Sequence, residues 1–327
     1  MKACVLHAIK DLEYTEIADP IVKSGEVLVQ ARACGICSSD LDRVFRTGAY
    51  HFPIVLGHEI AGQVVAVAPD VDSSLVGKRV VVYPLLPCFD CEACKKGFYT
   101  QCKRYNYFGS RCDGGYAQYL SVPVWNIKPF ADSVSFTHAA LCEPAAVAWN
   151  AVYKANIKPR TRLLIVGTGL IGLVVGLWAK QKGAKVSFKV RNSQKADFIK
   201  SLGFDHVRTE FEEGSFDTCM ECVGTNESIA QSISCVKARG TVIFVGNPQS
   251  DVILDKKIYW KILRQELVIK GVWNSTYPSD WEVVLKNISS LPCDKLITHT
   301  FKLSDGMKAF DTLNEAIFKI KGMYVSE

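Results

Sequence analysis

The sequence predicts an α/β protein with a β-rich N-terminal domain and a C-terminal domain built on a doubly wound parallel sheet. Up to about residue 150, short valine-rich runs are separated by Gly, Pro, Asp and Ser, which is typical of β-domains. From about residue 151, apolar strands alternate with helical stretches, as in a parallel sheet covered by helices on both faces. A chain of 327 residues is long enough for two such cores.

The composition limits the classes of protein to consider. The chain is 48% hydrophobic and 22% charged, which is typical of a soluble globular protein. Its net charge of +6 is modest and no aromatic-interleaved basic run occurs, so a nucleic-acid partner is not expected. The longest apolar run, 163–179, contains glycines throughout, which favours a buried strand and helix over a membrane span. The 13 cysteines are odd in number and the N-terminus lacks secretory features, so we expect a reducing, cytoplasmic setting.

In the first domain, expected over 1–150, strands are predicted at 26–33, 59–67 and 78–83. Four cysteines follow these strands within one short stretch: Cys88, Cys91, Cys94 and Cys102. Four thiolates so close in sequence fill the tetrahedral shell of Zn²⁺ and leave no position for substrate. We therefore predict a structural zinc in a lobe of about 84–104, with the chemistry elsewhere.

A second set of metal-binding residue types is spread along the same domain. Cys37, the pair His58 and Glu59, and the distant Glu143 offer sulfur, imidazole and carboxylate ligands, a mixed shell that zinc accepts. Each has an ordinary alternative, because Glu143 before Pro144 is also typical of a helix start and a single histidine usually packs or faces solvent. Their joint occurrence favours a metal with one exchangeable position.

The second domain begins with a buried strand at 163–166. The elements that follow are a helix at 170–182, a strand at 184–190, a helix at 193–202 and strands at 216–222, 240–245 and 267–271. The last part has two helices, 279–288 and 304–318, and a strand at 322–325. Because this tail breaks the alternation, we expect the second domain to span 151–278 and 279–327 to return to the first domain.

The first strand of that domain leads into a glycine motif. Gly167, Gly169 and Gly172 have the G-x-G-x-x-G spacing of a Rossmann nucleotide-binding loop, between a strand and a helix. The pyrophosphate would lie at the helix N-terminus, at Leu170 and Ile171. The alternative is a glycine-rich turn without a ligand.

The end of the second strand predicts the choice of cofactor. An acid at this position binds the ribose of NAD, whereas a nearby arginine accommodates the phosphate of NADP. Here Val190 occupies the acid's position, and Arg191 and Ser193 follow, with Lys195 further on. The sequence therefore favours NADP within an NAD(P) site; a tolerant NAD site with a surface arginine is the alternative.

Several blocks of the sequence resemble the medium-chain, zinc-containing alcohol and polyol dehydrogenases over essentially the whole chain. The blocks are 37–40, 44–49, 53–59, 84–89, 96–102, 109–111, 113–117 and 261–264. The resemblance is greatest to the branch that acts on sorbitol and on galactitol 1-phosphate. It implies a GroES-like first domain and two zinc ions per chain, the catalytic one held by Cys37, His58 and Glu143, with Glu59 as an alternating or water-bridged ligand.

The resemblance also implies an activity: interconversion of a secondary alcohol of a polyol, or of a polyol phosphate, and the ketose, by hydride transfer to or from NAD(P) with zinc as Lewis acid. Ser39 would be the first proton carrier, although it also suits a cap on a helix near 40–45. Homodimers or homotetramers are expected, joined through the sheet edge near 240–245.

Arg43 and Arg46 are candidates for binding a substrate phosphate, because the planar guanidinium suits that anion. They are equally well explained as surface cations. Tyr50, Trp273 and Lys261 are weaker substrate candidates.

Two other functions remain open. One is a metal-free, quinone-reductase-like NADPH reductase, and the other is a non-catalytic, zinc-stabilised scaffold of the same fold. The joint presence of Cys37, His58 and Glu143 argues against both. The enzyme should contain about two zinc ions per chain, and either rival about one.

Overall fold

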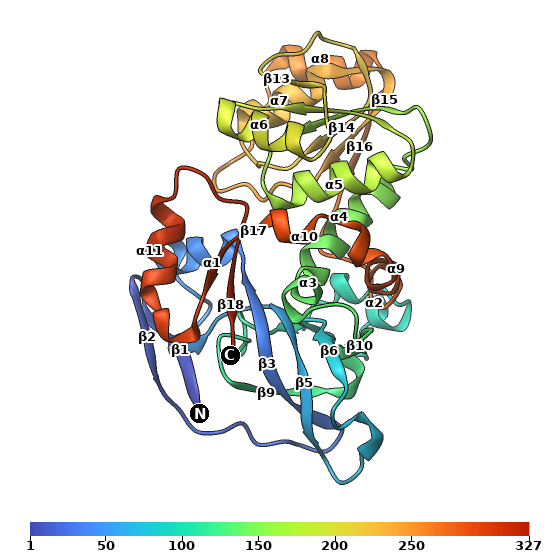
Figure 1. The fold of residues 1–327 in the computed structure, drawn as a ribbon. Helices are drawn as coiled ribbons and strands as arrows, with labels where there is room; N and C mark the ends of the chain where they lie inside the picture. The colour runs from blue at the N-terminus through green and yellow to red at the C-terminus, as the bar shows by residue number, and fades with distance from the viewer. Residues whose placement is uncertain (327) are drawn as a thin grey trace. The chain divides into compact units, whose positions relative to one another are not determined.

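The computed structural model describes residues 1–326 (Figure 1). The chain forms two compact units: unit 1 comprises Met1–Glu143 and Thr276–Glu327, and unit 2 comprises Pro144–Ser275. Unit 1 is therefore made of two separate stretches of chain.

The main sheet of unit 1 has seven strands in the order β10-β6-β5-β3-β18-β17, with β9 also paired to β3. These strands are β3 (Glu26–Ile36), β5 (Glu59–Val67), β6 (Arg79–Val82), β9 (Tyr119–Pro123), β10 (Ile127–Pro129), β17 (Ile297–Phe301) and β18 (Lys321–Val325). The antiparallel register of β3 and β5 pairs Gly35 with Glu59. As a result Cys37, just past the end of β3, lies near His58, just before the start of β5.

The C-terminal tail pairs directly with this sheet. Strand β18 runs antiparallel to β3, with Gly322 opposite Ile36, and parallel to β17. This pairing brings Lys321 to the same end of β3 as Cys37. A residue near the C-terminus thus lies beside residues from the first fifth of the chain.

Two smaller sheets complete the β-structure of unit 1. A three-stranded sheet has the order β2-β1-β4 and a two-stranded sheet pairs β7 with β8. Their strands are β1 (Lys2–Ala8), β2 (Asp11–Glu16), β4 (Ile54–Val55), β7 (Leu85–Leu86) and β8 (Asn106–Tyr107). The sequence did not predict β1 or β2, which lack a sustained valine-rich run.

The helices of unit 1 are short. They are α1 (Ser38–Asp42), α2 (Glu92–Lys95), α3 (Phe136–Ala140), α9 (Ser279–Asn287), α10 (Cys293–Leu296) and α11 (Met307–Glu315). A π-helical turn, Arg43–Thr47, continues α1. The helix predicted at 304–318 is shorter in the structure because Leu303–Asp305 forms a 3₁₀ turn and Gly306 follows with φ of 48°.

Unit 2 contains a six-stranded parallel sheet in the order β13-β12-β11-β14-β15-β16. The elements are β11 (Arg162–Val166), α5 (Leu170–Gln181), β12 (Lys185–Lys189), α6 (Ser193–Ser201), β13 (Val207–Arg208), β14 (Phe216–Glu221), α7 (Asn226–Cys235), β15 (Val236–Phe244), α8 (Lys256–Arg264) and β16 (Val268–Gly271). Helix α4 (Cys142–Lys154) starts at the end of the first stretch of unit 1 and continues into unit 2.

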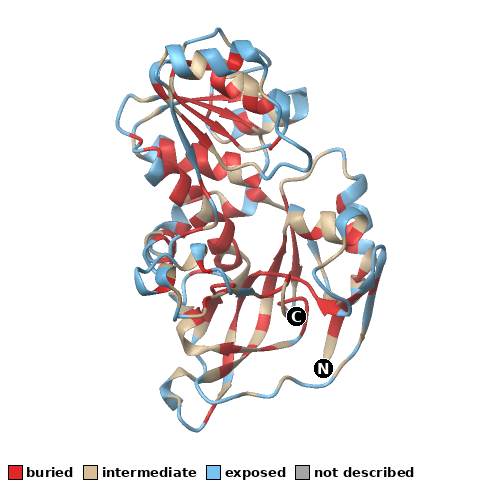
Figure 2. Ribbon diagram, turned by 180° about the vertical axis from the view of Figure 1, so that it is seen from behind, coloured by how far each residue is buried: buried red, intermediate tan, exposed pale blue. Residues whose placement is uncertain are grey.

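Helices cover both faces of this sheet, which confirms the doubly wound α/β prediction. Leu164 and Val166 of β11 pack in one core cluster with residues of α7 and α8. Ile165, which points to the opposite face, lies against Gly176 of α5. Figure 2 shows that buried residues follow the strands of both units.

One prediction about this sheet is wrong. Residues 240–245 were expected at its edge, but most of them belong to β15, which lies between β14 and β16. The edge strands are β13 and β16, and all four residues of β16 are exposed. In the described part of the chain, 1–326, no helix has the length and apolar character needed to cross a bilayer.

Candidate metal centre and cofactor site

The structure brings together three of the four residues predicted to hold a catalytic metal. Ligand atoms of Cys37, His58 and Glu59 all lie within 4.8 Å of one another. Cys37 is the N-cap residue of α1, while His58 and Glu59 stand where β5 begins. A Cβ atom at Gly35 would lie 1.9 Å from Glu59 Oε2, so only glycine at position 35 leaves room for that carboxylate.

His58 is oriented by a buried carboxylate that the sequence analysis did not assign. Asp40 Oδ1 lies 3.5 Å from His58 Nδ1, and Asp40 is fully buried. Tyr116 donates to Asp40 Oδ2 at 2.8 Å, and Arg43 Nη1 donates to Oδ1 at 3.0 Å. A carboxylate behind a histidine ring is the usual support of a metal-binding imidazole.

Glu143 lies beside the three-residue cluster but outside it. It occupies the first turn of α4, is 7% exposed, and accepts a hydrogen bond of 3.2 Å from Tyr107 Oη. Burial raises the pKa of Glu143 to about 7, although the nearby His58 opposes the shift. To serve as the fourth ligand, the Glu143 side chain would have to move closer to the cluster formed by Cys37, His58 and Glu59.

The most buried ion pair near this cluster joins Glu59 to the C-terminal tail. Lys321 Nζ donates to Glu59 Oε1 and Oε2 at 2.6 and 2.7 Å, and both side chains are almost fully buried. The same ammonium donates to the carbonyl of Ile36 at 3.1 Å. Burial opposes the charge on Lys321, but the negative charge of Glu59 raises the lysine pKa overall. Lys321 therefore fixes the position of the Glu59 side chain at the edge of the cluster.

The charges around the cluster favour a cation. Three buried carboxylates, Asp40, Glu59 and Glu143, face two cationic side chains, Lys321 and Arg43. Burial by itself lowers the pKa of His58, yet Asp40 and Cys37 raise it to about 10. The excess negative charge that holds a proton on His58 would hold a divalent metal ion in its place. The residues present therefore fit zinc.

The four-cysteine cluster also forms as predicted. Its ligand atoms, those of Cys88, Cys91, Cys94 and Cys102, lie within 4.8 Å of one another. The Cys91–Cys94 and Cys88–Cys94 sulfur distances are 3.5 and 4.0 Å. Sulfur atoms of a tetrahedral Zn–S₄ site are about 3.8 Å apart, given a Zn–S distance of about 2.3 Å.

Nearby hydrogen-bond donors stabilise the thiolate form of one of these cysteines. The backbone N–H of Cys91 donates to Cys88 Sγ at 3.4 Å, and Arg104 Nη2 approaches the same sulfur at 3.7 Å. Backbone hydrogen bonds from Cys91 and Asp90 are the main reason that the Cys88 pKa is lowered to about 6. Burial instead raises the pKa of Cys94 to about 12. The four thiols therefore do not all ionise without a metal.

In unit 2 the glycine loop has the geometry of a nucleotide site. Gly167 has φ of +112°, and a Cβ there would meet Cys222 and Val223. A Cβ on Gly172 would lie 2.0 Å from the Gly167 carbonyl oxygen. A Cβ on Gly169, by contrast, would meet no protein atom within 4 Å. The turn and the packing explain the first and third glycines, and close approach of a ligand explains the second.

The cofactor-selecting residues lie at the next helix. Val190 is buried, while Arg191 and Ser193 are exposed at the start of α6. Lys195 Nζ donates to the carbonyl of Thr168 inside the glycine loop at 3.4 Å. Cationic side chains thus stand beside the loop, and the described residues place no acid at the strand end.

The residues predicted to bind the substrate lie in different parts of the structure. Arg43 donates to Ser39 Oγ and to Asp40 at 3.0 Å each, so it is anchored beside the metal cluster. Arg46 pairs with Asp42 at 2.7 Å on the exposed side of the turn. Tyr50 is 67% exposed. Trp273 and Lys261 belong to unit 2; Trp273 is half exposed after β16, and Lys261 binds the Ser234 carbonyl.

Sequence reasoning assigned no role to Asp40, Tyr107 or Lys321. Asp40 has a local signal, because it stands three residues after the N-cap Cys37 and its carboxylate accepts from the Cys37 N–H at 3.3 Å. Tyr107 and Lys321 have none, since each meets its carboxylate through strand pairing and tertiary packing.

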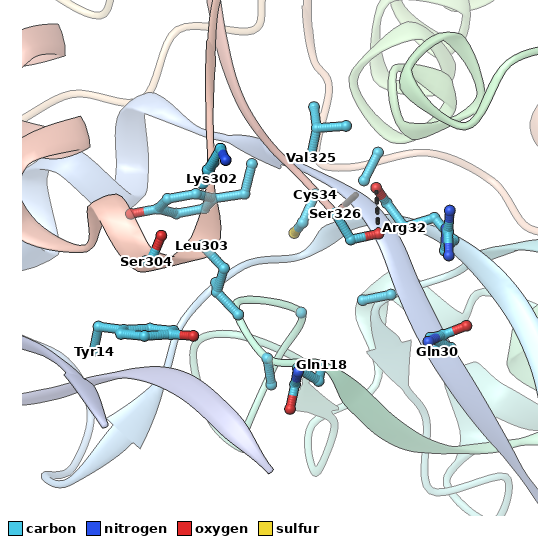
Figure 3. A pocket seen from close by; sticks show the side chains of 15 residues that line it. Tyr14, Gln30, Arg32, Cys34, Gln118, Lys302, Leu303, Ser304, Val325 and Ser326 are labelled. Carbon is cyan, nitrogen blue, oxygen red and sulfur yellow. Dashed lines mark hydrogen bonds between the residues drawn. The ribbon is translucent and has the colours of Figure 1, made fainter. Parts of the chain in front are cut away.

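Unit 1 also contains a cavity of about 400 Å³ that does not include the metal cluster (Figure 3). Its wall includes Tyr14, Gln30, Cys34 and Lys302, and Ser326 Oγ donates to the Arg32 carbonyl at 3.3 Å beside it. None of Cys37, His58, Glu59 and Glu143 lines this space.

Comparisons with known proteins identify the family of the chain. Residues 23–132 match the family model of the alcohol dehydrogenase GroES-like domain, and residues 171–290 match that of the zinc-binding dehydrogenases. Galactitol 1-phosphate 5-dehydrogenase of Escherichia coli K12 is 32% identical, with 91% of this chain and 92% of that protein covered. Sorbitol dehydrogenase of Bacillus subtilis is 29% identical, with 95% and 93% covered.

Solved structures agree with the sequence comparison. The crystal structure of galactitol-1-phosphate dehydrogenase from Escherichia coli superposes with a TM-score of 0.93 at 30% identity, and all of both chains is covered. The two family models together match most of the chain. The chain belongs to the zinc-dependent alcohol and polyol dehydrogenases, a family of oxidoreductases.

Proposed function

We propose that this oxidoreductase interconverts a secondary alcohol of a polyol, or of a polyol phosphate such as galactitol 1-phosphate, and the corresponding ketose, with NADP preferred over NAD. The observation that carries this proposal is the cluster of Cys37, His58 and Glu59 within 4.8 Å, in a surrounding with excess buried negative charge. The likeness to galactitol 1-phosphate 5-dehydrogenase and sorbitol dehydrogenase supports the substrate class.

Zinc bound by Cys37, His58 and Glu143 would supply a Lewis acid that lowers the pKa of an alcohol. The nicotinamide would supply the hydride acceptor. Asp40 holds the His58 ring in place, and Lys321 holds the Glu59 side chain beside the cluster as an alternating ligand. A second zinc in the four-cysteine lobe would be structural, because all four positions are filled by protein.

Ser39 is the residue that we assign to proton transfer. Its hydroxyl oxygen accepts a hydrogen bond from Arg43 Nη1 at 3.0 Å, and the residue is half-buried. The hydroxyl can take the alcohol proton on its oxygen and release its own proton to solvent. The adjacent Arg43 cation stabilises the negative charge that develops on this oxygen when its own proton leaves.

The NADP preference rests on Arg191, with Ser193 at the start of α6. An exposed guanidinium at the end of the second strand suits a 2′-phosphate, and the N-terminus of α6 adds partial positive charge. Self-association as a dimer or tetramer is expected through the exposed edge strand β16, whose unpaired backbone groups can pair with a second copy.

The experiment is a panel of polyols and polyol phosphates followed by nicotinamide absorbance with NAD and with NADP, alongside a zinc determination. We expect turnover and about two zinc ions per chain. Arg191→Ala should raise KM for NADP about tenfold or more while the KM for NAD stays within about twofold, since a charge-assisted phosphate contact is lost. Zinc content near one with no turnover on any substrate would overturn the proposal, and unchanged NADP use in Arg191→Ala would overturn the cofactor assignment.

A further inference from the structure

Arg111 stands out among the cations of unit 1 because its side chain is held rigidly but has no acidic partner. Its guanidinium carbon lies 4.3 Å from the ring centroid of Tyr105 and 4.7 Å from that of Tyr50. Nη1 donates to the Tyr105 carbonyl at 3.3 Å. Within residues 1–326 Arg111 forms no ion pair, so most of its five N–H groups remain available.

The backbone that carries Arg111 is fixed to the chain leading into the metal cluster. The Arg111 N–H donates to the Tyr107 carbonyl at 2.9 Å, and its own carbonyl contacts His51 Nε2 at 3.3 Å. Asp113, two residues on, accepts from the Val55 N–H at 2.9 Å. The guanidinium is therefore positioned before any ligand arrives, which reduces the entropy lost on binding.

A row of aromatic rings leads from Arg111 to the metal cluster. Tyr105 contacts Tyr107 edge-on with centroids 6.5 Å apart, and Tyr107 contacts the His58 ring in the same way at 5.7 Å. Tyr107 also donates to Glu143. An anion on Arg111 would thus sit to one side of the reacting carbon, as a group at the far end of a linear substrate must.

The other arginines of this region are already paired. Arg43 shares Nη1 between Asp40 and Ser39, and Arg46 is bound to Asp42. Arg43 compensates the buried Asp40 and cannot give up that partner without leaving an unpaired buried charge. Arg111 has no such obligation, and its stacked guanidinium presents in-plane N–H groups suited to a phosphate.

We propose that Arg111, clamped between Tyr50 and Tyr105, binds the phosphate of a phosphomonoester substrate and so selects polyol phosphates over free polyols. This inference rests on the proposed function and adds the residue that sets its substrate class.

The test compares galactitol 1-phosphate with galactitol in the zinc-loaded wild type, Arg111→Gln and Arg111→Lys. For Arg111→Gln we expect kcat/KM on the phosphate to fall about ten- to a hundredfold, mainly through KM, because charge-assisted hydrogen bonds are lost. The value for galactitol should stay within about twofold. Arg111→Lys should recover part of the loss, since it keeps the charge but not the planar fork.

The matched control is Arg79→Gln. Arg79 is likewise stacked on two rings, with 4.9 Å to Phe130 and 4.3 Å to Phe136, but it donates to the carbonyls of Asp132 and Val134. Its loss should lower the unfolding temperature and leave the ratio of kcat/KM for phosphate to free polyol unchanged. Equal loss on both substrates in Arg111→Gln would make Arg111 a structural clamp and overturn the inference.

Direct binding separates this inference from the proposed function. Galactitol 1-phosphate, galactitol and inorganic phosphate are titrated calorimetrically into wild type and Arg111→Lys. If neither polyol is oxidised but the phosphate still binds in an Arg111-dependent way, the proposed activity fails and the anion site stands. If the wild type oxidises galactitol at least as well as its phosphate, or binds the phosphate no better than the Arg111 variants do, the anion site is refuted while the oxidoreductase assignment remains.

Discussion

The two candidate zinc sites of unit 1 are built in opposite ways. The four-cysteine site comes from one stretch, Cys88 to Cys102, whose ends are joined by the short pair of β7 and β8. The other site takes Cys37, His58 and Glu59 from the meeting point of β3 and β5 and adds Glu143 from α4. One is a local loop, and the other depends on the whole sheet.

The groups that surround the two sites also differ. Around the four cysteines the supporting groups are backbone N–H groups and the exposed Arg104. Around Cys37 and His58 they are buried charged side chains, including Asp40 and Lys321. Buried charges cost free energy unless they are paired, so a metal ion at the second site would compensate its excess negative charge. A closed shell suits stability, and an incomplete one suits chemistry.

The largest expected effect comes from opening the local site. Cys94→Ser removes a buried thiolate ligand, and structural zinc binding contributes on the order of 10 kcal/mol to small zinc-stabilised folds. We expect zinc content to fall from about two to about one per chain and protease cleavage to appear within 88–102. Cys222→Ser, a cysteine of unit 2, is the control and should keep both ions. Unchanged zinc content in Cys94→Ser would show that the lobe holds no metal.

The site of Cys37, His58, Glu59 and Glu143, called the assembled site below, should lose activity and not stability when a ligand is removed. His58→Asn removes an imidazole ligand but keeps a side chain of similar size, so zinc content should also fall to about one. We expect kcat/KM to drop at least about a thousandfold, equivalent to about 4 kcal/mol. The four-cysteine lobe should stay protease-resistant, which distinguishes this variant from Cys94→Ser. Near wild-type turnover in a protein lacking this zinc would refute the contrast between the two sites.

A third variant tests the buried charge balance. Lys321→Met leaves Glu59 buried without its cation, and breaking a buried ion pair in this way costs about 3–5 kcal/mol. We expect that loss of unfolding free energy in chelator-treated protein and a smaller loss after zinc is restored, because the metal ion then compensates Glu59. The double variant Lys321→Met/Glu59→Gln should recover much of the loss. Equal destabilisation with and without zinc would separate Glu59 from the metal.

How much of each site is predictable from sequence follows from this difference in construction. The four cysteines and the Gly167–Gly172 loop are contiguous motifs, and the spacing of their residues largely sets their geometry. The structure places the four sulfur atoms close together and has a tight turn at Gly167. Alternating strands and helices predicted the sheet of unit 2. The order of β15 and β16 within that sheet was missed, because strand length and composition do not encode which strand is last.

The assembled site was predictable only in part. Cys37, His58 and Glu59 could be named because their residue types suit zinc. The partner of Glu59 could not, since Lys321 lies 262 residues away and looks like any lysine at a strand end. Arg43 suggested a phosphate ligand, but in the structure it neutralises Asp40, a pairing that depends on the turn after α1. Charge compensation of this kind appears only when the chain is folded.

The smallest expected effect is a difference between the two sites in how their zinc affinity depends on pH. Burial raises the pKa of Glu143 to about 7, so the metal-free fold holds a proton there that the unfolded chain, with a pKa near 4.5, releases. This contribution to stability is present below pH 4.5 and is lost as the pH rises through 7. Zinc binding requires the carboxylate, so affinity at the assembled site should rise about tenfold per pH unit below pH 7 from this group alone and level off above it.

Glu143→Gln removes that proton exchange. Zinc affinity measured by competition with a chelator from pH 5.5 to 8 should be weaker in the variant and should depend on pH by about one proton less. The four-cysteine site in the same molecule is the internal control, because its thiols lie outside the influence of Glu143 and its own pH dependence should not change. A variant whose assembled site keeps the wild-type slope would exclude Glu143 from the metal shell. The cluster would then consist of Cys37, His58 and Glu59, and Lys321 would have to release Glu59 whenever the metal binds.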